Sequence, residues 1–221
     1  QKSKDQIEAG DYIMTYLLKS LRYTFTIYSH PFEGFWFMKA EKRGNAATGI
    51  TILALLLLTT TVRIYTTGYV LSNITLINFS VWLLLIVIAG VILLYCISNW
   101  ALTTLLDGKG TFGEIFVSLM YSLTPIVIMN IPMTVLSNFI SYEGIPFYNF
   151  LNAATFLWAL FLLLSANLSI HDFTMFKSII TFVLTVVFML IIVVIGILFV
   201  NLCQEAYVWV AALVQEISYR L

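Results

Sequence analysis

The chain has 221 residues, of which 61% are hydrophobic and 10% are charged, and its formal net charge is zero. Soluble domains carry about 25% charged residues, so this composition excludes an ordinary soluble domain and predicts a polytopic membrane protein. The balanced charge gives no basis for nucleic-acid binding. The two cysteines form no CxxC or Cys/His cluster, so neither a disulfide framework nor a zinc site is predicted.

After a polar start, Asp11 to Ser29 is the first patterned segment. Its apolar residues recur at helical spacing, namely Ile13, Leu17, Leu21, Phe25 and Tyr28. This pattern predicts an amphipathic helix at the membrane surface. It either packs on the membrane domain, as apolar stripes usually do, or docks a partner.

An aromatic stretch, HPFEGFW, follows at His30. Pro31 disfavours helix at His30, and Gly34 permits a tight bend, so an interfacial elbow is predicted here. No second His, Cys or acidic residue is spaced to share a metal with His30.

Three basic residues, Lys39, Lys42 and Arg43, precede the first long apolar run. Basic residues beside a first membrane helix hold that end in the cytoplasm. The same three residues are a candidate contact for acidic lipid or for a partner protein.

Five apolar runs then follow, each about as long as a bilayer is thick. They cover residues 46–65, 81–102, 114–139, 147–166 and 179–202. The sequence therefore predicts an all-α polytopic membrane bundle of five transmembrane helices, in which the short connections make consecutive helices antiparallel neighbours.

The membrane domain is expected to span residues 46–202, between an N-terminal segment, 1–45, and a C-terminal segment, 203–221. Residues 204–221 have an apolar face and a polar face. They are expected to form a surface helix on the outer side or to continue the fifth span.

Charge counting gives an orientation. With the N-terminus in the cytoplasm, all of the 11 Lys and Arg residues except Arg63 and Arg220 fall on cytoplasmic segments. The positive-inside rule therefore predicts a cytoplasmic N-terminus and an external C-terminus. Arg63, near the outer end of the first span, is expected to snorkel toward the surface. Cys96 and Cys203 then lie too far apart to pair.

The third run is irregular, because Pro125 and Pro132 lie inside it with Asn130 between them. Each proline frees a carbonyl four residues earlier, those of Tyr121 and Ile128. A kinked span of this kind can line a small polar cavity. More often such groups bond neighbouring helices together.

Among the residues of this sequence, His171 and Asp172 most resemble a catalytic pair, because a histidine base and an aspartate that orients it are a common combination. Adjacent residues usually point apart, however, and no nucleophile motif accompanies them. The simpler expectation is that Asp172 caps the helix leading into the fifth span.

The turn from Asp107 to Gly110 lacks the Ser or Thr that a phosphate loop needs after its lysine. Thr111 and Glu114 instead fit a capping box for the third span. The span centres contain no Asp, Glu or Lys, which disfavours a proton- or sodium-driven carrier. No cofactor motif is present.

The segment GKGTFGE before the third run and Tyr121-Ser-Leu-Thr-Pro125 within it resemble the YIP1 family of integral membrane proteins. The His171 turn and the phenylalanine-rich fifth run add to the likeness, which covers residues 44–204. The lead-in HPFEGFW…EKRG resembles the bacterial branch, which implies the bacterial plasma membrane.

The resemblance implies a role without catalysis. Eukaryotic relatives act in vesicle traffic and bind Rab-type GTPases and one another, but their GTPase-binding region does not match residues 1–45. Bacterial relatives often lie near genes for sugar-import ABC transporters, which implies an accessory role.

We therefore expect a non-enzymatic membrane scaffold or accessory subunit that contacts lipids and binds other membrane proteins or itself. The alternative is a transport or channel component whose polar path is lined by the third span. A lipid enzyme acting at His171 and Asp172 is a weaker third hypothesis. No cofactor is expected, and the sequence identifies no small-molecule substrate.

Overall fold

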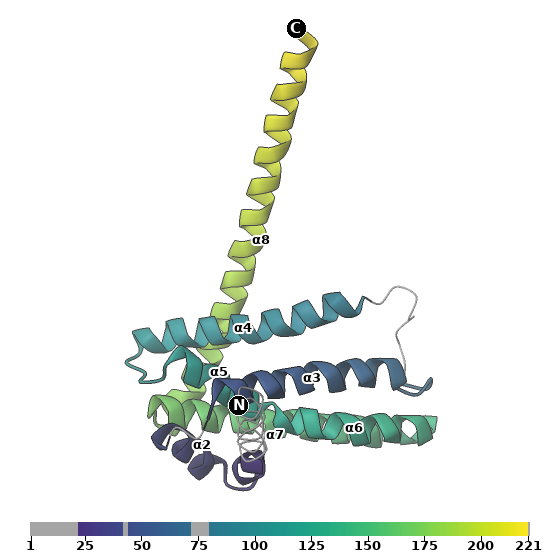
Figure 1. Cartoon of the computed structure of the whole chain (residues 1–221), viewed down its shortest axis with the longest axis vertical. Helices are drawn as coiled ribbons and strands as arrows, with labels where there is room; N and C mark the ends of the chain where they lie inside the picture. Colours follow the sequence, from purple (N-terminus) through teal and green to yellow (C-terminus); the bar gives the residue numbers. More distant parts are fainter. Residues whose placement is uncertain (1–21, 42–43, 72–79, 221) are drawn as a thin grey trace, which may run out of the picture.

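The computed structural model describes residues 22–41, 44–71 and 80–220. All regular secondary structure in these ranges is helical, which confirms the all-α prediction (Figure 1). Residues 22–29 form a short helical segment. The elements after it are α2 (Pro31–Ala40), α3 (Ala46–Thr66), α4 (Val81–Leu105), α5 (Phe112–Ser122), α6 (Thr124–Phe139), η2 (Tyr142–Gly144), α7 (Ile145–His171) and α8 (Met175–Arg220).

Five stretches of the described chain are long and apolar enough to cross a membrane. They are α3, α4, α5 with α6, η2 with α7, and α8. The third of these has the largest share of buried residues, 56%, compared with 22% for α4. The five predicted spans are confirmed by length and composition, and the irregular third span lies at the centre of the packing.

The third span is broken into two helices at Leu123, one residue before α6 begins. Pro125 has no N–H to bond to the carbonyl of Tyr121, and the Thr124 hydroxyl donates to that carbonyl instead, at 2.7 Å. Pro132 lies inside α6 without ending it. The predicted irregularity is confirmed, and the break is at the first proline.

The helices pair in an order that differs from the chain order. α3 packs mainly on α6 and α5, α4 packs mainly on α8, and α7 contacts α2, α5 and α6. Consecutive helices are neighbours at α6 and α7, as predicted, but α3 and α4 hardly touch. Residues 67–80 connect α3 to α4, and a connection of this length does not force the two helices side by side.

The helices other than α8 lie together as a layer that has two ends (Figure 1). The Lys39 end is where α2, α4 and α7 finish and α5 and α8 begin. The Arg63 end is where α3 and α6 finish and α7 begins.

The N-terminal elbow bends at His30 but not at Gly34. Gly34 is buried in the first turn of α2, where a Cβ would lie 2.9 Å from the Cα of Ile27. Tyr23 donates its hydroxyl hydrogen to the Gly34 carbonyl at 2.7 Å. The glycine therefore permits a close approach between two helices, and the predicted bend at this position is wrong.

Only part of the predicted amphipathic segment is described. Residues 22–29 are helical, as expected, but Phe25 and Tyr28 of the predicted apolar stripe are exposed. Thr24 and Ile27 are buried instead. The rest of that segment lies outside the described residues.

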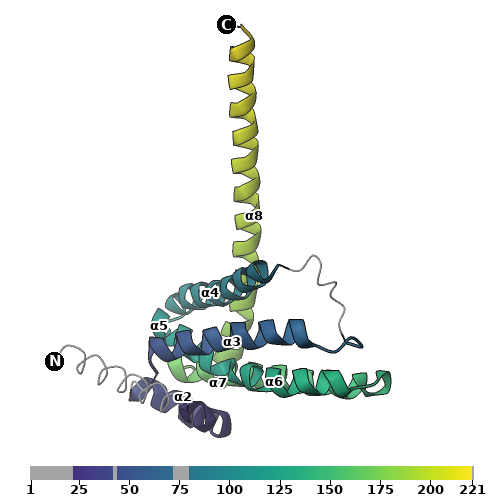
Figure 2. The ribbon, with the colours of Figure 1, turned by 45° about the vertical axis from the view of Figure 1, so that its right-hand side comes forward.

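α8 is a single helix of 46 residues, roughly 70 Å long at 1.5 Å per residue. Of the two alternatives for residues 204–221, the continuation of the fifth span is the one observed. No glycine or proline follows Gly196, so nothing in the sequence stops the helix. Figures 1 and 2 both show α8 leaving the layer of the other helices steeply.

The Thr124 hydroxyl gives a test of the break. Thr124→Val leaves the buried Tyr121 carbonyl without this donor, so we expect a loss of about 1–3 kcal/mol of stability, measured by thermal unfolding in detergent. The control is Thr104→Val, because the Thr104 hydroxyl donates at 2.6 Å to Trp100 inside an uninterrupted helix. Equal losses in the two variants would contradict this account of the break.

Candidate functional site

A buried polar cluster joins α4, α7 and α8 near the Lys39 end. The Asn99 amide donates at 3.3 Å to the side-chain oxygen of Asn167 and at 3.3 Å to the hydroxyl of Thr185. The Asn167 amide in turn donates to the backbone carbonyl of Ser178 at 3.2 Å. With His171, these four residues are called the Asn99 cluster. Because all five are buried, their hydrogen bonds are the specific contacts between three otherwise apolar helices.

His171 is the centre of this cluster and is 2% exposed. The N–H of Gly110 donates to its Nδ1 at 3.3 Å, and its Nε2 lies 3.2 Å from the side-chain oxygen of Asn99. This arrangement assigns the ring proton to Nε2, which donates to Asn99. Both ring nitrogens are therefore occupied by structural partners.

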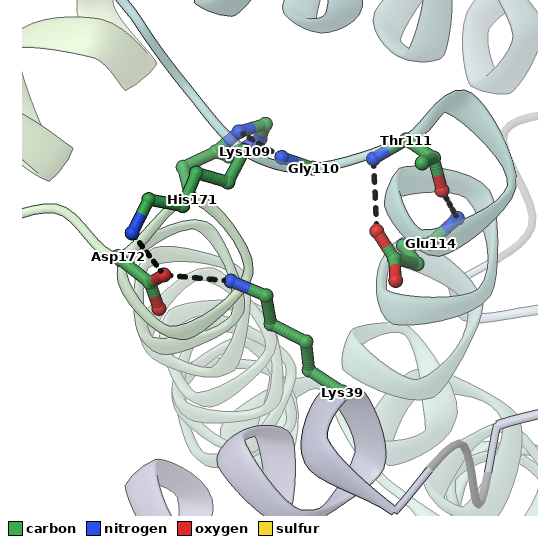
Figure 3. A network of polar contacts seen from close by, with 7 residues as sticks. All are labelled: Lys39, Lys109, Gly110, Thr111, Glu114, His171 and Asp172. Atoms are coloured by element: carbon green, nitrogen blue, oxygen red, sulfur yellow. Dashed lines mark hydrogen bonds and ion pairs between the residues drawn. The ribbon is translucent and has the colours of Figure 1, made fainter.

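The GKG turn, residues 108–110, packs closely against the His171 ring, and its two glycines make that approach possible. A Cβ at Gly108 would lie 2.7 Å from Nδ1 of His171, and a Cβ at Gly110 would lie 2.6 Å from Ile170 and 2.7 Å from Cε1 of His171. Side chains at either position would push the ring away. The next residues, Thr111 and Glu114, form the predicted capping box of α5 (Figure 3).

Asp172 does not act with the imidazole but faces two lysines. It ends α7 in the left-handed conformation, with φ of 54°. Its carboxylate lies 3.0 Å from Nζ of Lys39 and 3.3 Å from Nζ of Lys109 (Figure 3). The hydrogen bond from Lys39, and after it the one from Lys109, lower the pKa of this carboxyl below its ordinary value of 3.8.

The prediction that Asp172 caps the following helix is wrong. Thr174 takes that role, because its hydroxyl accepts from the Lys177 N–H at 3.4 Å. The Lys177 ammonium in turn donates to the Leu106 carbonyl at the end of α4, at 2.8 Å. The Lys39 end is therefore tied together by charges as well as by the buried amides.

The other predicted site residues are spread over the molecule. Tyr121 is fully buried in the core, with its ring edge-on to Tyr23. Pro125 lies in the first turn of α6 and Pro132 lies farther along it. Lys39 joins His171 and Asp172 at the Lys39 end, while Lys42 and Arg43 lie outside the described residues.

Asn130 links α6 to α3. Its amide donates to the hydroxyls of Thr59 and Thr60 at 3.2 and 3.3 Å, and its oxygen accepts from Arg63 at 3.0 Å. Asn130 therefore bonds neighbouring helices together, and it also lines a cavity beside Arg63. Arg63 does not snorkel as predicted but turns toward α6 and α7.

The sequence analysis did not identify Asn167, Thr185 or Lys109 as partners in these contacts. The available signal was an amide residue inside the second apolar run, Asn99, and another directly after the fourth, Asn167, because a buried amide requires a partner. Spacing within one helix does not reveal which helix supplies that partner.

The Asn99 cluster itself has little space for a ligand. The cavity beside Asn99 and His171 is about 10 Å³, which is near the minimum for one water molecule. Larger cavities of about 270 and 600 Å³ lie at the same end, beside Lys39 with Glu114 and beside Glu33 with Asp172. Within residues 22–41, 44–71 and 80–220, no three His, Cys, Asp or Glu side chains gather as metal ligands. The Asn99 cluster can therefore fix helices, and it offers no room for a substrate.

The fit of the GKG turn to His171 is testable by Gly110→Ala. The added methyl group must displace Ile170 or His171, so we expect a loss of about 1–3 kcal/mol in thermal unfolding. Gly113→Ala is the matched control, because a Cβ there meets nothing within 4 Å. A control as damaging as Gly110→Ala would show that the turn is sensitive for another reason.

The charge contacts of Asp172 give a pH prediction. A carboxyl with a lowered pKa stabilises the fold above its ordinary pKa, and this contribution is lost as the pH falls through the lowered value. Asp172→Asn should cost less than about 1 kcal/mol at neutral pH, because the pair is partly exposed, and the difference from the parent should vanish in acid.

The control for Asp172→Asn is Asp107→Asn. Asp107 is also left-handed, with φ of 58°, and exposed. No ion pair of Asp107 is found in the described part of the chain. If the two variants lost stability equally at neutral pH, the ion pairs would not be the cause.

The Yip1 domain matches residues 25–198, which begin in the helical segment before α2 and end in α8. No curated protein and no solved structure gave a significant match. Because the matched region is well over half of the 221 residues, the chain belongs to the Yip1 domain family of membrane proteins.

Proposed function

We propose that this protein is a non-enzymatic membrane scaffold or accessory subunit. The exposed part of α8, residues 190–213, binds another integral membrane protein in this proposal. The observation that carries the proposal is the exposure of α8. In its most apolar stretch 6% of the residues are buried, compared with at least 22% in every other candidate span.

The attachment of α8 to its own chain is confined to its beginning. Thr181 and Thr185 are buried against the bundle, whereas every residue from 190 to 213 except Ile192 is exposed. A transmembrane helix of a second protein offers apolar packing along this length. Lipid alone offers no specific contact, and association between membrane helices is driven by packing.

The non-enzymatic part of the proposal is supported by the Asn99 cluster. His171 uses both ring nitrogens for structural contacts, and Asp172 faces lysines. A general base needs a free nitrogen within reach of a substrate proton. A transport path is less well supported, because the cavity of about 650 Å³ that Asn130 lines lies at the Arg63 end, while the cavity beside Asn99, near the Lys39 end, is only about 10 Å³.

A finer proposal concerns location and partner. Lys39, Lys109 and Lys177 gather at one end, which supports a cytoplasmic Lys39 end by the positive-inside rule. The resemblance to bacterial relatives leads us to propose the plasma membrane and, as partner, the permease of a sugar ABC transporter.

The proposal is tested by photocross-linking in native membranes. A photoreactive benzoylphenylalanine replaces Leu198 on α8 or, as matched control, Leu93 on α4, which are both 57% exposed. We expect an adduct with one integral membrane protein from position 198 and none from position 93. Equal adducts from the two positions, or adducts only between copies of this chain, would contradict the proposal.

A further inference from the structure

Arg63 is held at the Arg63 end by uncharged partners. Its guanidinium donates at 3.0 Å to the side-chain oxygen of Asn130, at 3.0 Å to the hydroxyl of Tyr148 and at 3.2 Å to the side-chain oxygen of Asn152. These contacts turn a half-buried cation inward between α3, α6 and α7. Without them the side chain would be free to reach the surface.

No carboxylate balances this charge within the described residues. The ion pairs found there join Asp172 to Lys39 and Lys109, at the opposite end. Glu143 lies in η2 at the same end as Arg63 but does not line the cavity beside it. A partly buried charge without a countercharge is costly, and neutral acceptors offset only part of that cost.

A cavity of about 650 Å³ lies beside the guanidinium. Its polar lining, called here the Arg63 pocket, consists of Thr60, Arg63, Thr67, Asn130, Tyr148 and Asn149. A second cavity of about 360 Å³ shares Arg63, Asn130 and Asn149 with it. The size is within the range of small-ligand sites, about 300–1,000 Å³.

We propose that the Arg63 pocket binds an anion that bears a phosphate group. A guanidinium has five N–H donors, and three hydrogen bonds to protein leave capacity for an anion. Its planar fork suits phosphate, and the hydroxyls of Thr60 and Tyr148 and the side-chain amide of Asn149 add donors. Ile64, Leu71 and Ile126 form an apolar wall beside these groups, which suits the uncharged remainder of such a molecule.

Phosphate of this kind has two sources, an anionic phospholipid headgroup and a soluble phosphate. The test uses the full chain purified in neutral detergent. Phosphatidylglycerol, phosphatidylcholine and inorganic phosphate are titrated separately, and apparent Kd values are taken from the rise in unfolding temperature. Binding of phosphatidylglycerol without inorganic phosphate assigns the headgroup, and the reverse assigns the soluble ion.

Two variants test the pocket itself. Arg63→Gln removes the charge, and Asn149→Asp places a carboxylate in the lining while leaving the guanidinium in place. Each should weaken binding of the recognised probe at least tenfold. Asn149 is exposed and its side chain makes no hydrogen bond within the described residues, so Asn149→Asp remains informative if Arg63→Gln fails to fold.

The charge control is Arg22→Gln, on an exposed residue of the helical segment before α2, which should leave the affinity unchanged. The proposal is overturned if none of the probes binds, or if the probe binds Asn149→Asp as tightly as the parent. Phosphate binding at the Arg63 pocket requires no partner protein, so the outcome of this test is independent of the scaffold proposal.

Discussion

The hydrogen bonds of Asn99 are the constraint on which the rest of the structure depends. Apolar helices in lipid gain little by hiding apolar surface from each other, so a buried amide with a fixed set of partners decides how they meet. Asn99 bonds to α7 through Asn167 and to α8 through Thr185. Through His171 it also fixes the GKG turn that begins the third span. A buried amide left without partners would cost several kcal/mol in this environment, which is a large fraction of a domain's margin of stability.

The two ends of the layer differ in whether their positive charges have a negative partner. At the Lys39 end, lysines meet a carboxylate or a helix-terminal carbonyl. At the Arg63 end, one cation meets only neutral groups beside a large cavity. Charges are therefore compensated within the chain at the Lys39 end, whereas the charge at the Arg63 end is one that the proposed anion would balance. α8 starts at the Lys39 end, where Lys177 and Thr185 bond it to α4 and its long exposed part begins beyond these contacts.

Much of the fold could be predicted from local patterns in the sequence. The apolar runs set the number of candidate spans, the Thr111 and Glu114 pair set the start of α5, and Pro125 set the break in the third span. Pairing between helices could not be predicted, because spans that are apolar all round have no stripe to show which face is buried. The inward turn of Arg63 depends on α6 and α7, which are distant in sequence. The roles of Gly34 and Asp172 likewise depend on what packs against them, and at both positions the local interpretation was wrong.

The measurement that tests the central claim most directly is the stoichiometry of the protein in its own membrane. The full chain is purified in mild detergent from native membranes, and every co-purifying protein is quantified by mass spectrometry. The account predicts one integral membrane protein in near-equimolar amount, lost when Val194 and Leu198 on the exposed part of α8 are both replaced by charged residues. Recovery of this chain alone, as a monomer or only with copies of itself, would contradict the account.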